Sequence, residues 1–414
     1  MLNIFILCSL LSALFACSQN SRAAQNNTEA NCYEEIKCNQ ETEAPCNVIV
    51  GAARTYKYFP LLEGKRVAIM ANQTSVIGDV HLVDSLHRAG INIVGIFSPE
   101  HGFRGTACAG ESVTDSKDKE TGIPIWSLYQ GGRVGTPSAA QMRQVDILLF
   151  DLQDVGLRFY TYYISMMRLM EAATEHNKQM IILDRPNPNG FFVDGPILDM
   201  RHRSGVGAIP VPVVHGMTLG ELALMINSQG WLRNGVTANI TIIPNKNYTR
   251  QTRYRLRIPP SPNLPNMQSI YLYPSTCLFE GTVMSLGRGT PYPFQIYGHP
   301  DFTGSTFSFT PRSVPGAVNP PLLNRLSYGV DLRDMTYEEI WERGFDLSHV
   351  INAYRNLNIG ERFFTPMFEL LVGVSYVRRY IRAGKSAEEI REMWQEDVRQ
   401  FKIDRKPYLL YPDE

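Results

Sequence analysis

The sequence predicts an α/β protein built on a mainly parallel sheet that is covered by helices on both faces. Short, continuously apolar runs alternate along the chain with segments whose apolar residues recur at helical spacing. Strands that are apolar throughout, rather than at every second residue, are typical of a parallel sheet buried on both faces. Polar residues also cluster directly after several of these runs, where the carboxyl ends of parallel strands meet.

The expected elements follow one another in chain order. We expect strands at residues 67–70, 91–97, 145–150, 180–183 and 211–214. We expect helices at residues 79–89, in a short segment that begins at Thr136 and Pro137, at 161–176 and at 219–230. Gly90 suits the C-cap of the first helix. Two capping boxes, Thr218 with Glu221 and Ser386 with Glu389, mark the starts of further helices.

The N-terminus has the composition of a targeting segment. Residues 4–16 form an apolar run that is too short to span a membrane and is typical of a signal-peptide core. The run ends at Cys17 in a sequence that resembles a bacterial lipobox, so we expect a lipoprotein signal peptide over residues 1–17, with plain secretion as the alternative. Residues 18–47 are polar and are expected to form a flexible tether. Export would permit a disulfide among the tether cysteines Cys32, Cys38 and Cys46.

Length and composition predict two folded domains. The chain has 414 residues, and prolines become dense after residue 244. We therefore expect a first, catalytic domain over residues 48–240 and a second domain over residues 241–414 that ends in helices.

Charge and motifs exclude several classes of protein. The formal net charge is zero, whereas nucleic-acid binders usually carry a basic surplus. The histidines lack the spacing of a metal site, and neither a phosphate-binding loop nor a Gly-x-Ser-x-Gly elbow is present. We therefore expect no metal, no organic cofactor and no nucleic acid.

The segment from Ser98 to Gly105 is the strongest candidate for a functional site. It places Glu100, His101 and Arg104 directly after the expected strand at 91–97. In an open parallel sheet, ligands bind outside the carboxyl ends of the strands. A carboxylate, an imidazole and a guanidinium are therefore expected at the binding edge.

Similar polar clusters after other strands predict sugar chemistry. Glycoside hydrolysis needs one carboxylic acid that protonates the leaving oxygen and a second group on the opposite face of the ring. We expect Glu100 to be the acid and Asp154 or Glu280 to be the second group; Asp151 is a further candidate that equally suits a structural role. Candidates for binding the substrate are His101, Arg104, Asp151, Arg158, Tyr160, Tyr162, Asn187, His215 and Arg288.

Some of these residues also have simpler interpretations. A pair with Arg185 is an alternative interpretation of Asp184, and Glu221 is expected to serve as a helix cap. Tyr160 and Tyr162 equally suit an ordinary hydrophobic core.

Several long motifs together resemble one family. These motifs are Ser-Pro-Glu-His-Gly-Phe-Arg-Gly, Phe-Asp-Leu-Gln-Asp-Val-Gly-x-Arg-Phe-Tyr-Thr-Tyr, Asp-Arg-Pro-Asn-Pro-Asn-Gly, Val-His-Gly-Met-Thr, Ser-Pro-Asn-Leu-Pro and Phe-Glu-Gly-Thr followed by Gly-Arg-Gly-Thr. In this order, over residues 48–414, the sequence resembles the NamZ-type exo-β-N-acetylmuramidases. The resemblance implies a Rossmann-like first domain without a nucleotide, a smaller α/β second domain and an active site between them. It also implies release of N-acetylmuramic acid from non-reducing ends of peptidoglycan fragments, with Glu100 as the catalytic glutamate.

The resemblance leaves the mechanism and the sugar preference open. Either the substrate's own acetamido group attacks the anomeric carbon, or a second protein carboxylate serves as nucleophile or base. An arginine is expected to bind the lactyl carboxylate of N-acetylmuramic acid through two parallel hydrogen bonds. Arg158 and Arg288 are preferred for this role, because Arg104 would lower the pKa of the neighbouring acid. The alternative functions are a muropeptide-binding lipoprotein without catalysis and a nucleotide-dependent enzyme.

Overall fold

The computed structural model describes residues 48–100, 102–103, 115–130 and 133–413. The predicted signal peptide, tether and Cys17 lie outside the described residues, as do His101 and Arg104. None of the helices in the described ranges is long and apolar enough to cross a membrane.

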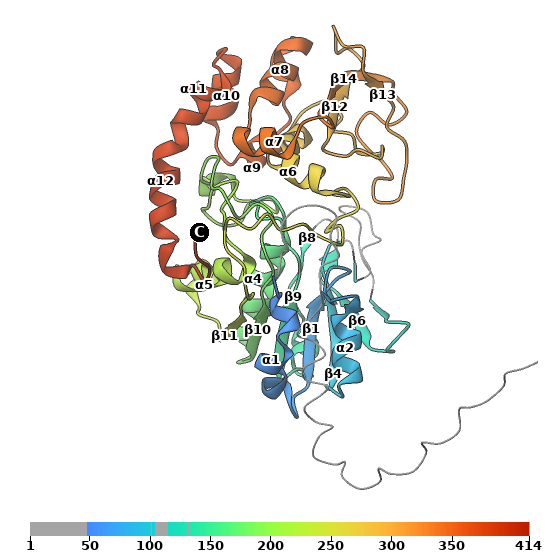
Figure 1. Ribbon diagram of the computed structural model, residues 1–414, viewed down its shortest axis with the longest axis vertical. Coiled ribbons are helices and arrows are strands. Elements are labelled where there is room, and N and C mark those ends of the chain that lie inside the picture. The colour runs from blue at the N-terminus through green and yellow to red at the C-terminus, as the bar shows by residue number, and fades with distance from the viewer. Residues whose placement is uncertain (1–47, 101, 104–114, 131–132, 414) are drawn as a thin grey trace, which may run out of the picture. The chain divides into compact units, whose positions relative to one another are not determined.

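A seven-stranded sheet, as far as the chain is described, forms the centre of the fold and confirms the predicted α/β class. Its order is β11-β10-β9-β1-β4-β6-β5, and the neighbouring strands are parallel except for β5 against β6. The strands are β1 (Val67–Ala71), β4 (Ile93–Ser98), β5 (Ser116–Lys117), β6 (Pro124–Ser127), β9 (Ile147–Asp151), β10 (Gln179–Leu183) and β11 (Ile240–Ile243). The chain runs outward from β1 through β4 to β6 and then returns to β9 on the other side, which is the doubly wound order of a Rossmann-like sheet (Figure 1).

Helices cover both faces of this sheet. They are α1 (Thr55–Leu62), α2 (Leu82–Arg88), α3 (Ala139–Met142), α4 (Tyr162–Glu175) and α5 (Leu219–Ser228). Val67 and Ile69 of β1 belong to the core cluster that contains residues of α1 and α2, whereas Ala68 and Met70 belong to the cluster that contains residues of α4 and α5. Since alternate side chains of a strand point to opposite faces, both faces are buried, as the continuous apolar runs predict.

The predicted strand at 211–214 is wrong. Val211, Val213 and Val214 are buried, but the segment forms only isolated bridges, from Val214 to Leu157 and Asp194. Pro210 and Pro212 lack the N–H groups that a sheet ladder needs. The sheet is completed instead by β11, which extends across residue 240, where we expected the first domain to end. The domain boundaries themselves stay a prediction.

The helix predictions hold with shifted ends. The helix expected from residue 79 begins at Leu82, because β2 (Val76–Ile77) and β3 (Val80–His81) form a hairpin before it. The helix expected from Thr136 begins at Ala139, because Ser138 serves as its N-cap. Both predicted capping boxes are present, at Thr218 with Glu221 and at Ser386 with Glu389.

The remainder of the chain combines helices with a small antiparallel sheet. The helices are α6 (Met267–Thr276), α7 (Tyr337–Arg343), α8 (Ser348–Leu357), α9 (Met367–Val372), α10 (Tyr376–Arg382), α11 (Ala387–Arg391) and α12 (Gln395–Asp404). The strands β12 (Ile296–His299), β14 (Ser327–Asp331) and β13 (Ser308–Phe309) pair in that order, and β7 (Tyr129–Gln130) pairs with β8 (Arg133–Val134). The helical segment that begins after Ser386 is divided, because the 3-10 turn Glu392–Trp394 separates α11 from α12.

Candidate active site

The candidate site lies where the central strands end at their carboxyl termini, which we call the carboxyl edge. The chain leaves β1 toward β4 on one side, and β9 adjoins β1 on the other. This reversal of strand order opens a crevice in doubly wound sheets, because the two following connections run to opposite faces. The residues after β4 and β9 therefore occupy the position where such folds bind ligands.

Glu100 follows β4 by two residues and contacts the start of α4. The hydroxyl of Thr161 donates a hydrogen bond of 3.1 Å to Glu100 Oε2. Thr161 is the N-cap of α4, yet its side chain makes no capping bond, so the hydroxyl is available to hold the carboxylate. Burial, and then the negative charge of Glu100, raise the pKa of the Tyr129 phenol, which follows β6. Glu100 thus lies half-buried between a threonine hydroxyl and a protonated phenol.

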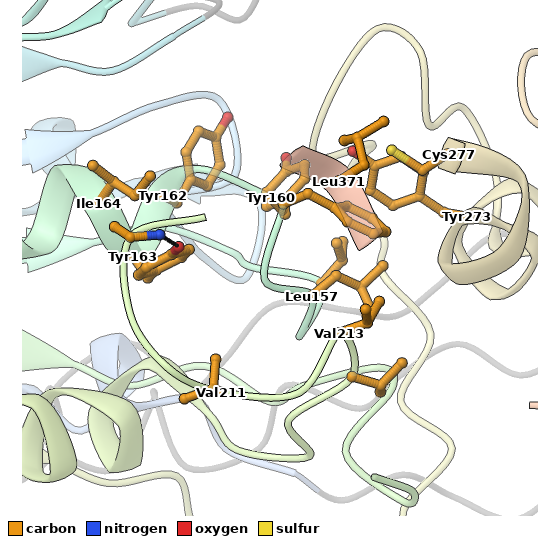
Figure 2. Packing of buried hydrophobic residues seen from close by; sticks show 14 of the residues in the cluster. Leu157, Tyr160, Tyr162, Tyr163, Ile164, Val211, Val213, Tyr273, Cys277 and Leu371 are labelled. Atoms are coloured by element: carbon orange, nitrogen blue, oxygen red, sulfur yellow. Dashed lines mark hydrogen bonds between the residues drawn. The ribbon is translucent and has the colours of Figure 1, made fainter. Parts of the chain in front are cut away.

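Two tyrosines at the start of α4 form the wall beside Glu100. The hydroxyls of Tyr160 and Tyr162 both donate to the carbonyl of Pro260, at 3.0 and 3.2 Å. Asn72, which follows β1, donates from Nδ2 to the Tyr162 hydroxyl at 2.9 Å. The two rings meet edge to face at 4.8 Å, and Tyr273 follows at 6.3 Å from Tyr160 (Figure 2). This row of rings connects the carboxyl edge to α6.

Asp154 is a buried carboxyl group, and only one of its two oxygens accepts a hydrogen bond within the described residues. Its Oδ1 accepts the N–H of Gly156 at 2.6 Å, whereas Oδ2 is buried and has no partner among the described residues. Burial raises the pKa of Asp154 to about 7. Gly156 has a φ of +79°, and a Cβ there would collide with the side chain of Asn187. A carboxyl whose pKa lies near neutrality can both give and take a proton, which suits general acid–base catalysis.

Glu280 and Arg288 form an ion pair at the far end of the tyrosine row. Arg288 Nη2 lies 2.5 Å from Glu280 Oε1, and both side chains are partly exposed. Glu280 lies in the 3-10 turn Cys277–Gly281 that follows α6. Burial raises the pKa of Tyr273 well above its usual value, and the nearby charge of Glu280 raises it further. The two candidate residues therefore lie together and next to Tyr273 of the row of rings.

Asp151 has a structural role that the sequence offered as one alternative. Arg185 donates to both of its oxygens, at 2.5 and 2.8 Å, and the pair is buried. The alternative interpretation that pairs Asp184 with Arg185 is therefore not what the structure shows. Asp184 instead accepts hydrogen bonds from Thr218 and Tyr411. Neighbouring residues in extended backbone point to opposite sides, so Asp184 and Arg185 find different partners.

Arg158 makes buried structural contacts in place of the expected contact with the substrate. Arg158 is fully buried and donates to the carbonyls of Pro196, Val211, Leu371 and Val372, at 2.7 to 3.0 Å. These contacts join the segment after β9 to the end of α9. They give Arg158 a structural role instead of the substrate contact that we expected.

Asn187 and His215 are likewise enclosed. Asn187 Nδ2 donates to the carbonyl of Met217 at 2.9 Å, and its Oδ1 accepts the N–H of Asn189. His215 Nδ1 accepts the N–H of Met217, and burial lowers its pKa to about 3, so the ring is neutral. Both side chains thus make hydrogen bonds that hold loop backbone, while His215 Nε2 is buried without a partner in the described ranges.

Sequence reasoning missed Thr161, Tyr129 and Asn72, which contact the candidate residues directly. Thr161 and Tyr162 are adjacent in one of the quoted motifs, and Tyr129 and Asn72 follow strands β6 and β1. The same signal that selected Glu100, a polar residue at a strand's carboxyl end, could have selected the last two. Within the described ranges, no group of three metal-binding side chains is present.

The described arrangement therefore offers two carboxyl groups, a row of aromatic rings and an arginine. Glu100 can reach a ligand at the edge, Asp154 can exchange a proton near neutral pH, and Arg288 is paired with Glu280 at the end of the row of rings. Glycoside hydrolysis uses such a combination, because it needs proton transfer on one side of the sugar and a second group on the other.

Comparison with known proteins identifies the family. Residues 67–268 match the family model for the N-terminal part of exo-beta-N-acetylmuramidase NamZ, and residues 271–411 match that for its C-terminal part. The chain is 37% identical over 374 residues to the peptidoglycan beta-N-acetylmuramidase NamZ of Bacillus subtilis (strain 168), covering 86% of this chain and 89% of the relative.

Two crystal structures of DUF1343 family proteins from Bacteroides fragilis NCTC 9343 share the fold. One is 59% identical with a TM-score of 0.83 and covers 89% of this chain and 99% of its own. The other is 28% identical with a TM-score of 0.72 and covers 88% and 99%. Matches over both parts, together with the identity to a curated relative, establish that the chain belongs to the exo-beta-N-acetylmuramidase NamZ family.

Proposed function

We propose that this protein is an exo-acting glycosidase that releases N-acetylmuramic acid from the non-reducing ends of peptidoglycan fragments. The observation that carries the proposal is Glu100, held by Thr161 at the carboxyl edge of the Rossmann-like sheet, in a chain of this family. A metal or organic cofactor has no part in the proposed reaction.

In the proposed reaction, Glu100 gives its proton to the glycosidic oxygen as the bond to the anomeric carbon breaks. The developing positive charge on the sugar is met from the other face by a nucleophile. That nucleophile is the acetamido oxygen of the substrate, a second carboxylate itself, or water activated by that carboxylate, for which Asp154 and Glu280 are the candidates. Asp154 has the stronger support, because its raised pKa of about 7 lets it accept a proton from water near neutrality and release it again.

The direct test is turnover by the purified protein. The disaccharide of N-acetylmuramic acid linked to N-acetylglucosamine should yield free N-acetylmuramic acid, and a chromogenic N-acetylmuramide should release its chromophore. Proton NMR of the first anomer formed distinguishes retention from inversion. Tight binding without turnover would instead support a muropeptide-binding protein, and binding of a nucleotide in a thermal-shift screen would support the third alternative.

We also propose that the protein is exported and anchored by a lipid on Cys17, in the periplasm or at the outer membrane. The support is the apolar run at 4–16 followed by the lipobox-like cysteine. The variant Cys17→Ser should move the protein from the membrane fraction to the soluble fraction while the activity per molecule stays the same. Continued partition with membranes would contradict the anchor.

A further inference from the structure

A second feature of the structure is an aromatic groove of about 660 Å³ beside the antiparallel sheet. We use this name for the cavity lined by Tyr292, Ile296, Phe307, Phe309, Arg312 and Arg333, among other residues. Nothing in the reaction described above uses these side chains. The lining is largely apolar, contains two guanidinium groups and contains no carboxylate.

The loop after Arg288 lines one side of the groove. Arg288 pairs with Glu280 at the end of the tyrosine row, and the next residue, Gly289, already lines the groove. The carbonyl of Gly289 accepts the N–H of Arg312 at 2.8 Å, and a Cβ on Gly289 would lie 2.4 Å from the Arg312 carbonyl. The loop and the Arg312 backbone are therefore fixed against each other.

The two arginines of the groove differ in how far their charge is neutralised. Arg333 is bound by Asp331 at 2.8 and 3.0 Å from its Nε, and its guanidinium stacks 4.1 Å from the centre of the Tyr292 ring. Arg312 is exposed, and its only hydrogen-bonded side chain in the described ranges is the neutral amide of Asn324, at 2.9 Å. Arg312 thus presents a positive charge that no described carboxylate neutralises.

Flat aromatic faces beside such a cation suit an acidic sugar. The C–H face of a pyranose ring is apolar and packs on aromatic rings, while a guanidinium binds a carboxylate through paired hydrogen bonds. A neutral sugar would leave Arg312 unused, and an anion without an apolar face would leave Phe307 and Phe309 uncovered. The groove therefore matches a ligand that combines a ring with a carboxylate.

We propose that the aromatic groove binds a second N-acetylmuramic acid residue further along the glycan, with its lactyl carboxylate at Arg312. The inference rests on the proposed function, because an enzyme that removes the terminal sugar must accommodate the rest of the chain. In peptidoglycan the sugar beyond the leaving N-acetylglucosamine is again N-acetylmuramic acid. The groove accordingly makes the enzyme prefer longer fragments.

The test compares fragment lengths in variants of the groove. The substrates are the disaccharide and the tetrasaccharide that begin with N-acetylmuramic acid. Arg312→Gln should lower kcat/KM for the tetrasaccharide by about tenfold, mainly through KM, and leave the disaccharide unchanged. Phe309→Leu, which keeps an apolar side chain but removes the flat ring, should lower it by about three- to tenfold. Arg325→Gln removes an equal charge from an exposed residue outside the groove lining and serves as the control.

A modified substrate shows whether the carboxylate is what Arg312 binds. A tetrasaccharide whose internal lactyl group is amidated should be a poorer substrate for the wild type and should be cleaved equally by wild type and Arg312→Gln. Equal losses on both fragment lengths, or no loss on either, would overturn the inference. If no fragment is cleaved at all, the proposed function fails, and calorimetry with the tetrasaccharide then decides the groove alone: weaker binding by Arg312→Gln supports it, and unchanged binding refutes it.

Discussion

Two groups of carboxyl groups lie at the carboxyl edge of the same sheet, and they differ in how completely their oxygens are satisfied. Beyond β10, Asp184 accepts hydrogen bonds from the hydroxyls of Thr218 and Tyr411 at 2.6 and 2.5 Å and from the N–H of Gly220 at 2.8 Å. Beyond β9, Asp154 Oδ2 has no partner in the described ranges. Burial raises the pKa of both, to about 6 for Asp184 and about 7 for Asp154.

Glu221 extends the satisfied group. It is fully buried, pairs with Arg250, and accepts the N–H groups of Thr218 and Leu410 at 3.0 and 2.7 Å. These bonds attach the C-terminal tail to the start of α5. Glu100, by contrast, is half-buried beside the Thr161 hydroxyl, and Asp154 is buried with one oxygen that has no partner in the described ranges. A buried polar atom without a partner costs stability, so the unpartnered Oδ2 of Asp154, combined with its raised pKa, makes this carboxyl group a candidate for function.

The largest expected effect is on turnover, and it distinguishes Glu100 from the fully hydrogen-bonded carboxyl groups. Glu100→Gln should keep the fold and lower turnover by about a hundred- to ten-thousand-fold, because the amide cannot protonate the leaving oxygen. Steady-state kinetics on a chromogenic muramide measures this, and unfolding curves confirm the fold. Glu175→Gln makes the same chemical change at the exposed end of α4 and should leave turnover unchanged. A Glu100→Gln enzyme within about threefold of wild type would remove Glu100 from the catalytic role.

Variants in the fully hydrogen-bonded group should lower stability and leave turnover unchanged. Arg250→Met leaves Glu221 buried without its cation, which should cost about 3–5 kcal/mol of unfolding free energy. Urea unfolding measures the loss, while kcat of the folded fraction should stay unchanged. Arg399→Met breaks an exposed pair with Glu396 and should cost less than about 1 kcal/mol. Equal costs for the two variants would show that the buried pair is not what holds the tail.

A variant of Asp154 should change stability in the opposite direction, because its removal should raise the free energy of unfolding. Its native pKa of about 7 lies above that of an unfolded aspartate, so between about pH 4 and pH 7 the native state binds more protons and stability falls as pH rises. Asp154→Asn removes this loss and should gain on the order of 2–4 kcal/mol at pH 8, with the gain shrinking toward zero near pH 4. Denaturation across this range measures the gain. If Asp154 is the second catalytic group, the more stable variant also loses turnover, whereas retained activity would assign that role elsewhere.

The fold was accessible to sequence reasoning because its signals are local. Continuous apolar runs located β1, β4, β9 and β10, and the capping boxes located two helix starts, since backbone and side-chain chemistry within a few residues decide both. The segment 211–214 failed because its apolar composition was read without Pro210 and Pro212, which remove ladder donors.

The partners in the site were less accessible, because they depend on contacts between distant segments. Thr161 lies 61 residues from the glutamate that it binds, and Arg158 reaches Val372, which is 214 residues away. A strand-end position predicts that a side chain belongs to the edge. It does not predict whether a neighbour from another element satisfies it, and that difference separates Asp154 from Asp184.

The smallest expected effect tests whether Arg288 reads the lactyl group. N-acetylmuramic acid differs from N-acetylglucosamine only by that ether-linked acid, and a hydrogen bond to a charged group contributes about 1.5–3 kcal/mol. Arg288→Gln should therefore lower kcat/KM for a muramide by about ten- to a hundredfold and hardly change the slow hydrolysis of a glucosaminide. Both rates come from the same chromogenic assay.

Two further variants distinguish selectivity from loss of structure. Arg288 also neutralises Glu280, so Arg288→Gln leaves the Glu280 carboxylate without its cation. The double variant Glu280→Gln, Arg288→Gln shows whether this unpaired carboxylate causes the loss of kcat/KM for the muramide. We expect the double variant to remain unable to distinguish the muramide from the glucosaminide. Arg158→Ala should instead destabilise the protein and lower both activities in proportion, since it leaves four carbonyls without their donor. If Arg288→Gln also loses both activities in proportion, Arg288 has a structural role like that of the fully paired charges. The lactyl group is then bound by another residue of the carboxyl edge.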